Sequence, residues 1–187
     1  MILVSSEHSF PYRLRDPKLD FNLENFNGYI YAGEVPPKDM YELLTTKWGI
    51  ESDVALALIN IYGGHIYDMQ KALSRLNSDK AKFRQFFDSN LSDNVVECLD
   101  WKFEDDADKK RMRDTLRQLA ETGFVPLMKI NDPVAKVISL NNVGRVVKKS
   151  GIVVGLRTEV LEQTKFENGI VPSKQSMRLV IAEMLEE

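Results

Sequence analysis

A set of basic residues at helical spacing is the first candidate for chemistry in this sequence. Lys109, Arg113 and Arg117 are four residues apart, so they would share one face of a helix and could contact nucleic-acid phosphates. Three more basic residues would extend that surface from a nearby loop: Arg145, Lys148 and Lys149. Four acidic residues on the same helix offset its charge: Asp106, Asp108, Asp114 and Glu121. We therefore favour a solvated helix face over a nucleic-acid site.

Residue types that bind metals or act as nucleophiles are scarce. Cys98 is the only cysteine, which excludes an intramolecular disulfide and fits a reducing compartment. His8 and His65 are the only histidines, and with one distant cysteine they supply no metal site. Neither G-x-S-x-G nor the phosphate loop G-x-x-x-x-G-K-[ST] occurs. The acidic group Asp105, Asp106 and Asp108 is explained by the preference of a helix start for acids.

Composition describes an ordinary globular chain. Of its 187 residues 43% are hydrophobic and 28% charged, and the net charge is −3. Both signs are interspersed, which argues against a chain built wholly around nucleic acid. The opening apolar run of residues 2–4 is too short for a signal peptide or a membrane span. We expect a soluble intracellular protein, cytoplasmic or nuclear, with no membrane partner.

The first region, residues 1–77, is expected to end in a small helical bundle. Residues 2–4 and 29–31 have strand character, and residues between them read as loop. Pro36-Pro37 then opens a helix that ends at Gly49. A second helix runs from about Ser52 to Tyr62, and a third carries Ile66, Met69, Leu73 and Leu76 on one face. Gly63-Gly64 reverses the chain between them.

The second region, residues 78–187, is expected to combine helices with a smaller β part. Helices are predicted around residues 83–87, 95–103 and 112–120, with Gly123 ending the last. Two β-branched runs, 125–130 and 134–140, predict a hairpin around Asn131-Asp132-Pro133. Further strands are predicted at 143–147 and 152–156, and a final helix follows Pro172. The fold class is thus mostly α with a smaller β part, in the order of a winged-helix-like domain, with a boundary near residues 76–80.

Gly63-Gly64-His65 admits two interpretations. A turn that stops a helix explains the two glycines, because glycine reaches left-handed backbone angles without strain. The surrounding run, residues 58–67, also resembles the Gly-Gly-x-Pro element that ends a lid helix in STAND and archaeal-type ATPases of the AAA superfamily. Ile66 stands where that family has proline. Leu3-Val4-Ser5-Ser6 resembles the sensor strand of the same family, and Crinkler-type proteins carry similar ATPase halves.

The resemblance implies that residues 1–77 are the end of an ATPase core and its helical lid. The nucleotide-contacting positions would be Ser5 and Ser6, after the sensor strand, and Gly63, Gly64 and His65, at the lid turn. A hydroxyl after the sensor strand could hold the terminal phosphate or the attacking water. ATP and Mg²⁺ would be cofactors only of a complete ATPase, and none is expected for this chain alone, which would couple the ATP state to a protein partner or a missing ATPase half.

Two alternatives belong to other classes of protein. The chain could be a winged-helix nucleic-acid-binding module, with Lys109, Arg113 and Arg117 on the helix that enters a groove. It could instead be a protein-interaction domain without chemistry. Salt-dependent DNA binding would favour the first of these, because phosphate contacts release counterions.

Overall fold

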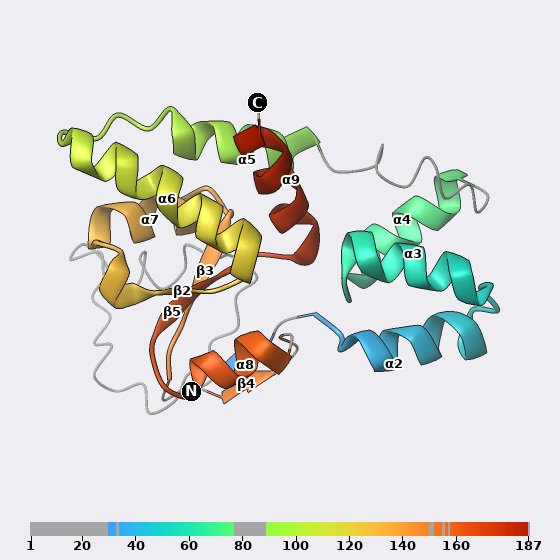
Figure 1. Ribbon diagram of the computed structural model, residues 1–187. Coiled ribbons are helices and arrows are strands. Elements are labelled where there is room, and N and C mark those ends of the chain that lie inside the picture. Colours follow the sequence, from blue (N-terminus) through green and yellow to red (C-terminus); the bar gives the residue numbers. More distant parts are fainter. Residues whose placement is uncertain are drawn as a thin grey trace, which may run out of the picture.

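The computed structural model describes residues 30–32, 34–76, 89–149, 152–154, 156 and 158–186. Figure 1 shows two lobes: a helical lobe formed by residues 34–76, and a C-terminal lobe formed by the described residues from 89 onward. The fold is mostly α-helical with a smaller β part, as the sequence predicts. Within the described ranges, no helix has both the length and the apolar character needed to cross a membrane.

The helical lobe contains the three expected helices. The first, α2 (Pro37–Glu42), starts with proline at its N-terminus and continues as a π-helical stretch, Leu43–Lys47. The second, α3 (Ser52–Tyr62), has the predicted bounds and ends at Gly63, whose φ of 61° places it in the left-handed region. The chain then reverses into α4 (Ile66–Leu76). The chain reversal at Gly63-Gly64 is therefore confirmed.

The C-terminal lobe alternates helices with short strands. Its helices are α5 (Ser89–Leu99), α6 (Asp106–Thr122), α7 (Asp132–Leu140), α8 (Thr158–Thr164) and α9 (Gln175–Glu186). Its strands are β2 (Val125–Pro126), β3 (Gly144–Val147), β4 (Ile152–Val154) and β5 (Gly169–Pro172). The last helix, α9, contacts α5 and α6 on one side and α3 of the helical lobe on another.

The strands form two small sheets. In the antiparallel sheet the order is β2-β5-β3, so the last strand lies in the middle, with Val146 opposite Ile170. The second sheet pairs β1 (Ile30–Ala32) with β4 in parallel, in the register Ile30 to Ile152. Residues 30–32 therefore pair with the C-terminal lobe, although the predicted boundary places them in the first region.

Each lobe buries its own apolar side chains. The core of the helical lobe is formed by Met40, Leu44, Val54, Ala55, Leu58, Tyr62, Met69 and Ala72. The C-terminal lobe has a larger core in which Leu116, Ile138, Ile170 and Met177 are fully buried, and a smaller one around Phe124 and Val147. Among the described residues these clusters share no member, so the lobes are not joined through one continuous apolar core.

The predicted hairpin of residues 125–140 is wrong. Only Val125–Pro126 is a strand; a 3-10 turn, Leu127–Lys129, follows it, and Asp132–Leu140 is helix α7. The side chain of Asn131 accepts a hydrogen bond from the Val134 N–H and so caps this helix, while a proline sits in its first turn, where no N–H partner is needed. Val134, Val137 and Ile138 then bury one helical face. Cap and spacing thus outweigh the β-branched composition of the run.

The other expectations have separate outcomes. Asp105 caps α6 by accepting from the Ala107 N–H, and Gly123 ends that helix at φ 76°, as predicted. The strand expected at 152–156 is β4, and it pairs with β1. The strand expected at residues 2–4 and the helix expected around 83–87 lie outside the described residues.

Candidate functional site

The Gly63-Gly64 turn is packed tightly against the segment that precedes α2. The Val35 N–H donates to the Gly64 carbonyl over 3.3 Å. A Cβ added to Gly64 would lie 1.9 Å from the Val35 carbonyl oxygen, a distance that real Cβ atoms do not adopt. Gly64 needs glycine for this close backbone approach, and Gly63 needs it both for its positive φ and because a Cβ there would overlap the Glu34 carboxylate and the Gln175 side chain.

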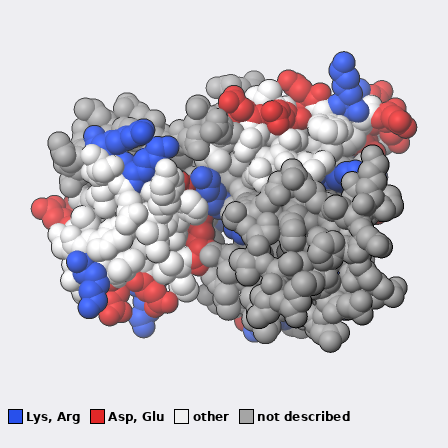
Figure 2. Space-filling model, turned by 180° about the vertical axis from the view of Figure 1, so that it is seen from behind, with Lys and Arg blue, Asp and Glu red and all other residues white. Residues whose placement is uncertain are grey.

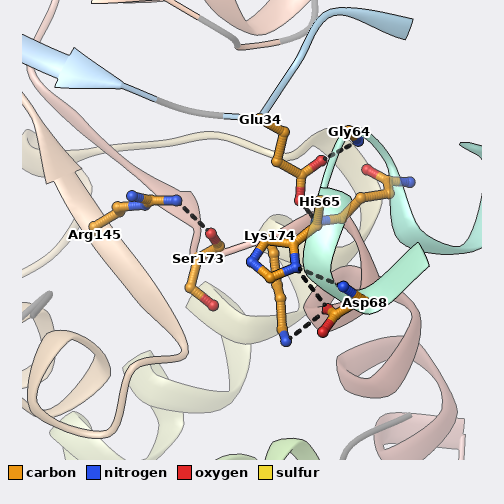
Figure 3. Close-up of polar contacts among 8 residues, drawn as sticks. Glu34, Gly64, His65, Asp68, Arg145, Ser173 and Lys174 are labelled. Carbon is orange, nitrogen blue, oxygen red and sulfur yellow. Dashed lines mark hydrogen bonds and ion pairs between the residues drawn. The ribbon is translucent and has the colours of Figure 1, made fainter. Parts of the chain in front are cut away.

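The Glu34 carboxylate connects this turn to the start of α9. Its Oε2 accepts a hydrogen bond from the Gly64 N–H at 2.9 Å, and its Oε1 accepts one from the Gln175 N–H at 2.8 Å (Figure 3). Gln175 is the first residue of α9, so its N–H has no acceptor within its own helix. A single partly buried carboxylate therefore satisfies one backbone donor from each lobe.

A second polar contact lies beside the first. Lys174 donates to the Oδ2 of Asp68 at 2.9 Å, and the Nδ1 of His65 lies 3.1 Å from the same oxygen. Burial by itself would raise the pKa of Asp68, but the hydrogen bonds and charges of His65 and Lys174 lower it to about 2. The stability that this group contributes is therefore present above pH 3.8, its ordinary value, and is lost as the pH falls toward 2.

Glu34 titrates in the opposite sense. Burial raises the pKa of its carboxyl above 4.5, and the hydrogen bonds from Gln175 and Gly64, with the charges of His65 and Arg145, offset only part of the rise. Because burial disfavours the charged form, the stability that depends on this titration is greatest below 4.5 and decreases as the pH rises through the raised pKa. The ionised form is nevertheless the one whose two oxygens can accept from both N–H groups. A small cavity of about 60 Å³ beside Glu34 is large enough for water.

The start of α9 is held in place by the C-terminal lobe. Arg178 donates to the carbonyls of Ala120 and Glu121 at the end of α6, where a cation is favourable. Arg145, on β3, donates to the carbonyl of Ser173, just before α9. Lys174 and Gln175, which donate to Asp68 and Glu34, therefore lie in a segment that the C-terminal lobe holds in place. We call the contacts of Glu34 and Asp68 with Lys174 and Gln175 the polar joint.

The structure gathers only part of the predicted nucleotide site. Gly63, Gly64 and His65 lie at the polar joint, whereas Ser5 and Ser6 lie outside the described residues. Sequence reasoning missed the residues that complete the joint: Glu34, Asp68, Lys174 and Gln175. Glu34 is 30 residues from Gly64 and 141 from Gln175, so no local spacing could reveal these pairs.

Two of the predicted basic residues are paired with acids. Lys109 lies 2.7 Å from Asp106 on α6, and Arg117 lies 3.5 Å from Asp114. Arg113, on the same helix, is exposed. Lys148 and Lys149, which follow β3, are also exposed, and Arg145 is partly buried. The charged residues that line a neighbouring cavity of about 400 Å³ are three bases and one acid: Lys110, Arg111, Lys129 and Asp114. Of these, Arg111 is paired with Asp108.

Acidic and basic side chains both occur on the face of the molecule that Figure 2 draws. On the face drawn in Figure 2, Lys and Arg lie beside Asp and Glu on both lobes, without a broad area of one sign in the part that is coloured. On this face, therefore, the coloured residues form no broad area of positive charge of the kind that phosphate binding needs.

The lid turn does not fit a nucleotide in this arrangement. The Gly64 N–H, which the resemblance would place beside ATP, donates to Glu34 instead. The Glu34 carboxylate would repel a phosphate at this position. Among the described residues, no three His, Cys, Asp or Glu side chains are grouped as metal ligands. Comparisons with protein-family models, curated proteins and solved structures find no match to this chain.

Replacing Gly64 should disrupt the joint more than replacing a glycine that needs only its backbone angle. In Gly64→Ala the new Cβ must push the segment of Val35 away, which breaks the hydrogen bonds at the turn. We expect the free energy of unfolding to decrease by about 3 kcal/mol or more. Gly49 has φ 66° and open space around its Cβ position, so Gly49→Ala should cost about 1 to 2 kcal/mol. Urea unfolding measures both, and an equal or smaller loss for Gly64→Ala would contradict the packing described here.

Proposed function

We propose that this chain is the lid and winged-helix-like portion of a P-loop ATPase, which passes the state of a nucleotide site to a partner domain and has no catalysis of its own. The observation that carries the proposal is the polar joint. Through it, the turn between α3 and α4 reaches the first residue of α9 by way of Glu34. A displacement of the helical lobe would therefore move the start of α9, the last helix of the C-terminal lobe.

The order of elements in the C-terminal lobe supports the winged-helix part. Helix α6 is followed by the short strand β2, then by α7, and then by β3 and β5, with the sheet order β2-β5-β3. A winged helix also has its last strand in the middle of the sheet, but it has two helices between the short strand and the paired strands; here the 3-10 turn Leu127–Lys129 and α7 occupy that place. Here β4 and α8 are inserted between the two paired strands.

This order argues against the nucleic-acid alternative. In a winged helix the reading helix directly precedes the paired strands, and that position belongs to α7, not to the basic helix α6. The exposed residues of α7 are Asp132, Pro133 and Lys136, one acid and one base. Lys109, Arg113 and Arg117 thus lie on a helix that would not enter a groove.

What the proposal requires is a phosphate loop from elsewhere, on the same polypeptide or on another. No G-x-x-x-x-G-K-[ST] occurs in the 187 residues, and the amide at the lid turn is already bonded to Glu34. A protein-interaction domain without chemistry would need no phosphate loop. The need for one therefore distinguishes the ATPase hypothesis from the interaction-domain hypothesis.

The purified chain should therefore show no Mg²⁺-dependent ATP hydrolysis above buffer, and at most weak ATP binding. Ser5, Ser6 and the lid turn cannot by themselves neutralise a triphosphate. Phosphate release and calorimetric titration with MgATP measure the two quantities. Turnover that co-purifies with the chain, and that disappears in the variant Ser5→Ala with Ser6→Ala, would show that the chain is an enzyme by itself.

Duplex DNA should not bind in a sequence-specific manner. We expect dissociation constants no tighter than the non-specific range, about 10⁻⁴ to 10⁻⁶ M. The reasons are that acids pair with Lys109 and Arg117 and that the net charge is −3. A fluorescence-anisotropy titration at physiological salt decides this. Tight binding that Arg113→Ala with Arg117→Ala abolishes, while circular dichroism is unchanged, would make nucleic-acid recognition the leading function.

A further inference from the structure

The two lobes are built so that they can move relative to one another. Their apolar cores share no described residue, and the contact between the Gly-Gly turn and the start of α9 is made by polar groups. Interfaces of this kind permit domain motion unless specific contacts hold them closed. The contacts at the joint therefore decide whether the described lobes behave as one body.

Glu34 occupies the position where such motion would be controlled. Strand β1 is paired with β4 of the C-terminal lobe, while α2, which begins at Pro37, belongs to the helical lobe. Glu34 and Val35 lie on the connection between them, and both are tied to Gly64 by hydrogen bonds. The remaining carboxylate oxygen of Glu34 then reaches across to Gln175.

We propose that the Glu34 carboxylate is a releasable latch that holds the helical lobe against the start of α9. In the closed state the carboxylate bridges the N–H groups of Gly64 and Gln175. In the open state the bond to Gln175 is broken and the helical lobe turns away from α9. The latch would operate in any protein with this joint, whether or not the chain serves an ATPase.

Release is compatible with an intact fold on both sides. Opening exposes one carboxylate and one helix-end amide, and water can solvate both. The cavity beside Glu34 already gives water a place next to the carboxylate. The Lys174–Asp68 contact lies on the same side of the joint and would separate in the same motion. The contacts between α3 and α9 would also be broken, while the two apolar clusters share no member and can each stay intact.

Distances between spin labels on the two lobes test the latch. Glu42 on α2 and Lys136 on α7 are both exposed and can be replaced by cysteine for labelling. Cys98 can stay, because burial raises its pKa to about 12 and the thiol is therefore not reactive near neutral pH. Double electron–electron resonance on the otherwise unaltered chain should give a single narrow distance.

Variants at Glu34 should then lose that narrow distance. Glu34→Ala removes both acceptors and should give a broad distribution that extends to longer distances. Glu34→Gln keeps only one acceptor oxygen, since its amide nitrogen faces N–H donors, and should give an intermediate width. The matched control is Glu51→Gln, an exposed glutamate at the start of α3, which should leave the distribution unchanged.

Several results would overturn the latch. One is a distribution as narrow as that of the unaltered chain in both Glu34 variants. Another is a broad distribution when Glu34 is in place, because the carboxylate would then hold nothing closed. If Glu34→Ala does not fold, Glu34→Gln carries the test. Loss of the circular dichroism signal in Glu34→Gln would also count against a latch, because it would make Glu34 a requirement of the fold and not a releasable contact.

Discussion

A carboxylate held between two backbone N–H groups is the constraint on which the arrangement of this protein depends. Glu34 receives one hydrogen bond from the turn after α3 and one from the first residue of α9. Hydrogen bonds to an ionised acceptor are stronger than those between neutral groups, and both donors would otherwise lack a protein partner at this position. The contact therefore replaces the continuous apolar core that the two described lobes do not share.

The same contact gives the Gly63-Gly64 turn a structural role within the chain. The turn brings backbone within close range of a second chain segment, and here that segment belongs to the same chain, at Glu34 and Val35. Under the proposed function, the resemblance to an ATPase lid concerns the arrangement of these helices and not a nucleotide contact at the turn. Arg178 and Arg145 fix the start of α9 on the C-terminal lobe.

The sequence predicts elements well where local spacing and caps agree. Helix α3 was bounded correctly because an apolar stripe ends at two glycines, and α6 because acids begin it and Gly123 ends it. The run of residues 134–140 was misassigned because β-branched residues favour strands, although Val134, Val137 and Ile138 are also spaced for a helix. Nothing local predicts the pairing of β1 with β4, or of Glu34 with Gln175, since these partners are more than a hundred residues apart.

A titration followed by nuclear magnetic resonance tests the central contact most directly. It would record the carboxyl carbon of Glu34 together with the amide signals of Gly64 and Gln175 as the pH changes. If one carboxylate bridges both amides, all three signals should shift with a single midpoint, and burial should place that midpoint above 4.5, the value of an ordinary glutamate. Amide signals of Gly64 or Gln175 that do not follow the titration of Glu34 would contradict the bridge between the two lobes.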